Sequence, residues 1–164
     1  MKNLLIFTLL FSSLGVFSQK KISPQKLLGS YSLESIDNVY PDGRRVYPYG
    51  KKPSGLLFFE KNGSYAIQIL SEVRPTIVST DKNNLTPEEY ASIVKAFNSH
   101  YGTYEINSEE KTIKFNINHA SYPKWENTVQ ERSFTFSQGT LKYVVTRTTQ
   151  GGDSVVAEVV WKKL

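Results

Sequence analysis

Two side chains that could bind or transform a small molecule are expected to point into a β-structure. In residues 112–119 the apolar side chains occupy every second position, and His119 continues that series. In residues 130–136, Arg132 shares a strand face with two phenylalanines. Because successive side chains of a strand point to opposite faces, both groups are expected to lie inside with the hydrophobic residues.

Each of these groups has two interpretations. Arg132 either clamps an anion or a carbonyl group of a ligand, or forms an internal ion pair with Glu105 or Glu158 that fixes strand register. His119 is either a pocket donor or general base, since its unperturbed pKa is about 6.5, or a core histidine bonded to a hydroxyl or carbonyl. The sequence leaves both pairs of alternatives open.

Aromatic residues surround the same segments. Small-molecule pockets combine aromatic and aliphatic walls with a few placed polar groups. We therefore expect Arg132 and His119 to be the polar anchors of a binding site. The expected walls are Tyr65, Tyr101, Tyr104 and Trp125.

Other chemistries have little support in the sequence. The chain has no cysteine, and its two histidines, His100 and His119, are not at a zinc-ligand spacing. A Gly-x-Ser-x-Gly motif, a phosphate-binding glycine loop and a dinucleotide fingerprint are absent, so we expect neither a metal nor a cofactor. The net charge of +5 is spread over isolated basic pairs, which argues against nucleic-acid binding.

The elements that must position these residues are mainly β-hairpins. Residues 55–59 are apolar, and in residues 64–70 large apolar side chains occupy every second position. Asn62-Gly63 between these segments is a strong turn motif. The same pattern recurs to the end of the chain and predicts roughly eight or nine short strands. Since no strand–helix–strand rhythm is present, the sequence predicts an all-β, antiparallel barrel whose strands each have one apolar face.

One helix is expected within this β-structure. Thr86 is a typical N-cap, Pro87 follows at the first helical position, and Glu89 completes a capping box. Apolar residues then recur at helical spacing, which predicts a helix over about 87–99 with one face buried against the sheet. The residues of that face are Tyr90, Ile93, Val94 and Phe97.

The first residues resemble a secretory signal. Lys2 precedes a short apolar run, and small or branched residues end at Ser18. We expect residues 1–18 to be a signal peptide, 19–26 an N-terminal segment that starts at Gln19, and 27–164 a single domain. The signal predicts a secreted or periplasmic protein. Because the chain has no cysteine, we expect this protein to be neither a lipoprotein nor disulfide-bonded.

Several blocks in order resemble the bacterial and fungal lipocalin-like domain family. The most specific are residues 101–106, 119–125 and 130–132, and further matches extend the resemblance from about Leu27 to Leu164. It implies a β-barrel with a central cavity. One departure is Tyr31, which occupies a first-strand position where lipocalins typically carry the tryptophan that closes the barrel floor.

These observations favour an exported, monomeric lipocalin-like barrel that binds a small, partly apolar molecule in its interior. One alternative is an enzyme of the same fold, of isomerase or cyclase type, in which His119 transfers a proton. Another is an interaction module whose barrel is filled with side chains. An open cavity separates the first two from the third.

Overall fold

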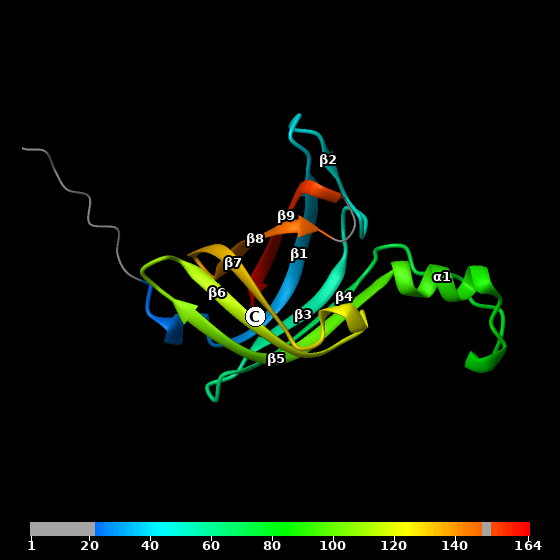
Figure 1. The fold of residues 1–164 in the computed structure, drawn as a ribbon, viewed down its shortest axis with the longest axis horizontal. Coiled ribbons are helices and arrows are strands. Elements are labelled where there is room, and N and C mark those ends of the chain that lie inside the picture. The colour runs from blue at the N-terminus through cyan, green and yellow to red at the C-terminus, as the bar shows by residue number, and fades with distance from the viewer. Residues whose placement is uncertain (1–21, 149–151) are drawn as a thin grey trace, which may run out of the picture.

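The computed structural model describes residues 22–148 and 152–164, which form a nine-stranded antiparallel sheet closed into a barrel (Figure 1). Pairing of the first strand with the last closes a ring of eight, and the short second strand pairs only with the end of the first, outside the ring. The predicted antiparallel barrel is confirmed. Its strands are β1 (Gly29–Val39), β2 (Arg45–Val46), β3 (Ser54–Phe59), β4 (Ser64–Leu70), β5 (Phe97–Asn107), β6 (Thr112–Ala120), β7 (Thr128–Ser137), β8 (Thr140–Thr148) and β9 (Gly152–Lys163).

Tight turns set the register of the hairpins. Gly63 has a φ of 86° in the β3–β4 turn, as the Asn-Gly motif predicts. In the β7–β8 turn both Gln138 (φ 50°) and Gly139 (φ 75°) are left-handed, which is the geometry of a type I′ hairpin. These turns decide which side chains of each strand face the interior.

One half of the barrel is filled with side chains. Leu27, Tyr31 and Trp161 are fully buried there, and the Tyr31 hydroxyl donates to the Leu27 carbonyl at 2.7 Å. Leu27 ends a short 3-10 helix, η1 (Pro24–Leu27), which covers this end of the barrel. Tyr31 thus closes the barrel floor in place of a tryptophan, and burial raises its pKa to about 12.

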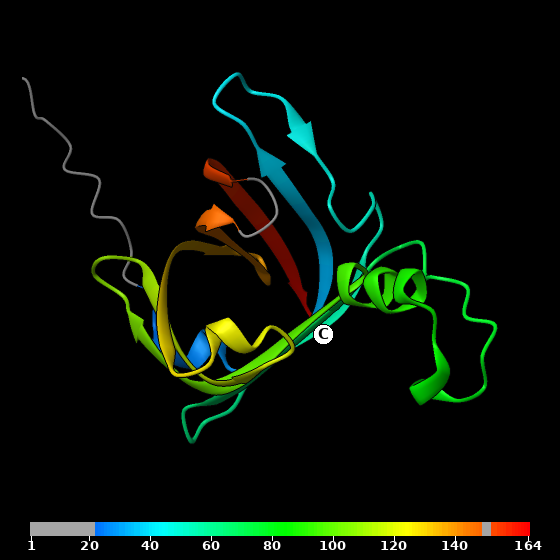
Figure 2. The same ribbon diagram turned by 45° about the vertical axis from the view of Figure 1, so that its right-hand side comes forward.

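The predicted helix exists, but it is shorter and more exposed than expected. Helix α1 spans Pro87–Lys95, and Thr86 and Glu89 form the predicted capping box. Phe97 pairs instead with Leu70 as the first residue of β5, because the β4–β5 ladder extends that far. None of the helix residues is buried, and Val94 is 71% exposed, so the prediction of a buried face is wrong. Figure 2 shows α1 outside the barrel wall.

The expected signal peptide, residues 1–18, lies outside the described residues. Among the residues that the structure describes, no helix is long and apolar enough to cross a membrane.

Candidate functional site

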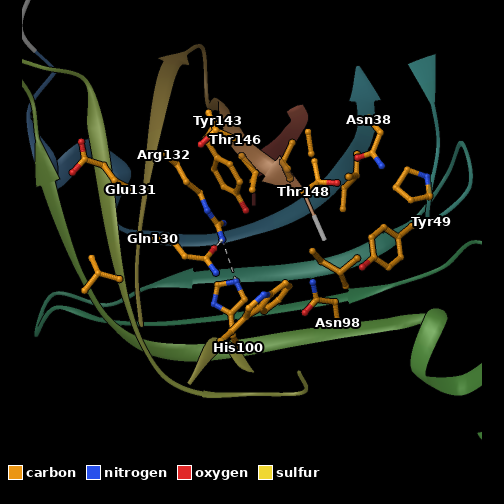
Figure 3. Close-up of a pocket in the computed structure, with 18 residues that line it drawn as sticks. Asn38, Tyr49, Asn98, His100, Gln130, Glu131, Arg132, Tyr143, Thr146 and Thr148 are labelled. Atoms are coloured by element: carbon orange, nitrogen blue, oxygen red, sulfur yellow. Dashed lines mark hydrogen bonds between the residues drawn. The ribbon is translucent and has the colours of Figure 1, made fainter. Parts of the chain in front are cut away.

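The unfilled half of the barrel contains a cavity of about 350 Å³ (Figure 3). It is lined by residues of several ring strands, of the segment before β3, and of a short 3-10 helix, η3 (Pro123–Trp125), between β6 and β7. The lining is mixed, with aliphatic and aromatic walls and a few polar groups. The polar or ionisable members are Asn38, Tyr49, Asn98, His100, Gln130, Glu131, Arg132, Tyr143, Thr146 and Thr148.

Arg132 lies on β7 and points into this cavity, as the strand pattern predicted. Arg132 is only 5% exposed, and its guanidinium carbon lies 4.5 Å from the ring centre of Phe115 and 4.8 Å from that of Tyr143. Nη2 donates to Gln130 Oε1 at 2.7 Å, while Nε is buried without a hydrogen-bond partner. The guanidinium is therefore held by two aromatic rings and an amide, which are all neutral groups.

The ion pair considered as an alternative for Arg132 does not form. Glu158 bonds instead with Arg45 and Lys142, each at 2.9 Å, on the outside of the barrel. Glu105 is exposed. Among the described residues, no carboxylate forms an ion pair with Arg132, so a buried cation faces the cavity without a balancing charge.

His100, on β5, is the histidine that lies inside the barrel. It is 4% exposed, its Nδ1 lies 2.8 Å from the Tyr65 hydroxyl, and its Nε2 lies 3.5 Å from Arg132 Nη2. Burial, and secondarily the Arg132 charge, hold the pKa of His100 well below its usual range. Because a guanidinium can only donate, Nε2 is the acceptor and Nδ1 carries the proton toward Tyr65. The imidazole is thus neutral at physiological pH.

His119 does not face the interior, so the predicted orientation of this residue is wrong. Its side chain is 62% exposed, and its Nδ1 lies 3.7 Å from Glu126 Oε1 on the outer surface. The cause is a register shift: Gly102 pairs with Ile117, but Tyr101 pairs with His119. The extra residue, Asn118, reverses which side chains of β6 face inward beyond Ile117. The catalytic alternative that required His119 inside the barrel loses its basis.

The four predicted wall residues lie in four different places. Trp125, in η3, lines the cavity, and its ring centre lies 5.9 Å from that of His100. Tyr65 is buried directly behind His100, and burial raises its pKa. Tyr104 packs on Phe59, with ring centres 4.6 Å apart. Phe59 belongs to the core of the filled half and is not part of the cavity lining.

Tyr101 lies on the outer face. It is 53% exposed, and its ring centre lies 5.2 Å from that of His119 in a tilted arrangement. Both residues therefore lie outside the barrel and away from the predicted site.

Sequence reasoning missed His100, Asn38 and Asn98. The inward orientation of His100 could have been predicted, because it precedes Gly102 and Tyr104 at alternate positions of one strand. It was missed because a helix was expected to reach residue 99. Asn38 is 2% exposed, and Asn98 Oδ1 is buried without a hydrogen-bond partner. Both amides line the cavity across from Arg132 (Figure 3). A lone asparagine in a strand has no sequence pattern that marks it.

The family model of lipocalin-like domains matches residues 28–164 of the chain, a range that contains every strand of the barrel. The chain belongs to the lipocalin-like domain family. None of the curated proteins matches it. In this lipocalin-like barrel, the cavity is lined by a polar set of Arg132, His100, Gln130, Asn38 and Asn98.

The polar set favours binding over acid–base chemistry. His100 Nδ1 is occupied by Tyr65, and its Nε2 faces a cation. Among the described residues, no group of three or more His, Asp and Glu side chains could hold a metal ion. What the site offers a ligand is a fixed positive charge, neutral amides and apolar walls.

Proposed function

We propose that the lipocalin-like barrel binds a small, partly apolar molecule that carries a carboxylate or another anionic group, with Arg132 as its anchor. The observation that carries this proposal is the buried guanidinium with no carboxylate partner among the described residues. Taking an ion out of water costs several kcal/mol unless an opposite charge compensates it. An anionic ligand would supply that charge.

The size and lining of the cavity support the same reading. A volume of about 350 Å³ lies at the lower end of the range for small-molecule pockets. Ile36, Ile69 and Val159 offer an apolar surface near the polar set. The ligand is therefore a compact molecule, or a longer one of which only the anionic end is enclosed.

The proposal is tested by comparing an acid with its own ester. Dansyl-labelled aminoundecanoic acid and its methyl ester have the same apolar chain and fluorophore, and only the acid carries a charge. We expect the acid to bind, and to lose about 2–5 kcal/mol of affinity on Arg132→Met, which is the scale for removing one partner of a buried charged pair. The ester should bind weakly to both proteins.

Equal affinity of acid and ester for the wild type, or acid binding that Arg132→Met leaves unchanged, would overturn the anion site. Arg132→Lys is the matched control. It keeps the charge but loses the planar fork of donors, so acid binding should weaken less than with methionine.

We also propose that the protein is exported and monomeric. Export rests on the resemblance of residues 1–18 to a signal peptide. N-terminal sequencing of protein recovered outside the cytoplasm should begin at Gln19, and an intact Met1 would contradict this. Native mass spectrometry of the same sample would give the subunit number and the mass of any retained ligand.

A further inference from the structure

The barrel wall is open between β7 and β8. These strands pair only at the hairpin end, from Phe134↔Tyr143 to Ser137↔Thr140. Beyond those pairs, residues 128–133 of β7 and 144–147 of β8 have no strand partner, within the part of the chain that the structure describes, on the edges that face each other. On their other edges, β7 pairs with β6 and β8 with β9. We call this opening the β7–β8 split.

The unpaired backbone groups of β7 can be assigned from the ladder. The Phe134 N–H donates to the Lys111 carbonyl at 2.8 Å, on the β6 side. Because backbone N–H and C=O groups of successive strand residues point to alternate edges, those of Val129, Glu131 and Ser133 point into the β7–β8 split. Three alternate donor–acceptor positions of this edge thus have no strand partner among the described residues.

The cavity opens through the same split. A cavity closed behind β7 would touch only the inward residues, Gln130 and Arg132, yet the outward residues Val129 and Glu131 line it as well. Val129 is 62% exposed. In Figure 3 the two strands diverge from their hairpin, with Gln130 and Arg132 on one side and Tyr143 on the other. The buried guanidinium is therefore reached past an unpaired strand edge.

We propose that the β7–β8 split takes an extended peptide, which adds to the β7 edge as an extra strand and places an acidic side chain on Arg132. Free strand edges bind extended chains by main-chain hydrogen bonds, and alternate side chains supply specificity. A residue directly across from Arg132 would have its Cβ about 4.5–5.5 Å away on the inward face. A Glu or Asp there meets the unpaired cation.

The neighbouring inward position of the peptide defines the rest of its chemistry. Two residues from the acidic side chain, the peptide would face Gln130 and the ring of Trp125, both in the cavity lining. An apolar residue fits that position. The acidic preference rests on the proposed function, because both use Arg132 as an anion site, whereas the strand addition rests on the backbone edge alone.

The probe is a pair of capped, fluorescently labelled peptides, Thr-Leu-Thr-Glu-Thr-Leu-Thr and the same sequence with Gln at its centre. A Leu two residues before and another two residues after the central position allow the peptide to add to β7 in either the parallel or the antiparallel direction. Fluorescence anisotropy should show that the Glu peptide binds the wild-type protein at least about tenfold more tightly than the Gln peptide. Arg132→Met should abolish that difference.

A backbone substitution tests the strand addition separately. Glu131→Pro removes an N–H that points into the split and has no partner in β6, and proline is tolerated at strand edges. Glu131→Ala removes the same carboxylate but keeps the N–H. We expect the proline variant to bind both peptides at least about tenfold more weakly than the alanine variant.

Hydrogen exchange of the wild-type protein gives a readout that needs no variant to fold. The amides of Val129, Glu131 and Ser133 should exchange rapidly in the free protein and slowly with the Glu peptide. The amides of Gln130 and Arg132, which face β6, should be slow in both states.

Absence of binding by both peptides, or binding without slower exchange at those three amides, overturns the proposal. Equal binding of the Glu and Gln peptides with slowed exchange overturns the acidic preference and leaves the strand addition. If the dansyl acid binds through Arg132 but the peptides do not, this inference fails while the proposed function stands.

Discussion

Replacing Arg132 by methionine separates a ligand-anchoring cation from a structural one. Methionine keeps most of the aliphatic volume and removes the charge and all five donors. In the structure this deletes a 2.7 Å hydrogen bond to Gln130 and the stacking of the guanidinium between Phe115 and Tyr143. It leaves no carboxylate of the described residues stranded, because none pairs with Arg132.

The expected size of the effect follows from these contacts. Loss of a charged hydrogen bond costs about 1.5–3 kcal/mol, and each cation–π contact contributes about 0.5–2 kcal/mol. Against this, the folded protein no longer has to bury a charge, which costs several kcal/mol per ion, and the thioether can still contact the two rings. The opposing terms nearly cancel. We therefore expect the free energy of unfolding of the ligand-free protein to change by less than about 2 kcal/mol.

The assay is urea unfolding of the wild type and the variant, both without ligand, with equal dependence on urea as the check that the same transition is compared. A loss of roughly 3–5 kcal/mol is the cost of breaking a buried ion pair. Such a loss would refute the conclusion that Arg132 lacks an internal partner, and with it the main support for an anion site.

Three further predictions follow from the described contacts. The folded state keeps His100 neutral, so below a pH of about 6.5 the unfolded chain binds a proton that the folded chain does not. The free energy of unfolding should therefore fall by up to about 1.4 kcal/mol per pH unit as the pH is lowered, until the pH reaches the lowered pKa of His100 in the folded protein. Urea unfolding at several pH values should show that this part of the slope disappears in His100→Gln; an unchanged slope would mean that the imidazole ionises inside the barrel. Gly102→Ala should lower stability by about 1–3 kcal/mol, because the new Cβ would lie 2.0 Å from the Asn116 carbonyl oxygen, and a melting curve equal to that of the wild type would contradict this close approach. Val94→Lys should change the free energy of unfolding by less than about 0.5 kcal/mol, since the side chain is 71% exposed, and a loss above 2 kcal/mol would mean that this helix face is covered in solution.

Local patterns in the sequence were sufficient for most of the barrel. Alternation and turn chemistry are properties of adjacent residues, so the hairpins around Asn62-Gly63 and Gln138-Gly139 could be predicted without knowledge of the rest of the chain. The orientation of Arg132 was also predictable, because β7 continues from Arg132 to the hairpin turn without a register shift. The capping box of α1 was equally local.

The failures lie where contacts between distant segments decide the local structure. Helix periodicity continued to Phe97, but pairing with β4 takes this residue into β5. The apolar spacing of Tyr90 and Val94 was correct for a helix and said nothing about whether another surface covers that face.

The sequence by itself determined that an arginine faces the interior of an antiparallel barrel. Only the tertiary structure decided which histidine joins it, because the register shift opposite Gly102 turns His119 outward, while β5 brings His100 to within 3.5 Å of Arg132. The same holds for the charge of the site. Glu158 was as plausible a partner as any in the sequence, but it lies on the outer face of β9 with Arg45 and Lys142. Strand alternation fixes only the side of the sheet on which a residue lies, whereas the pairing between strands fixes which residues meet there.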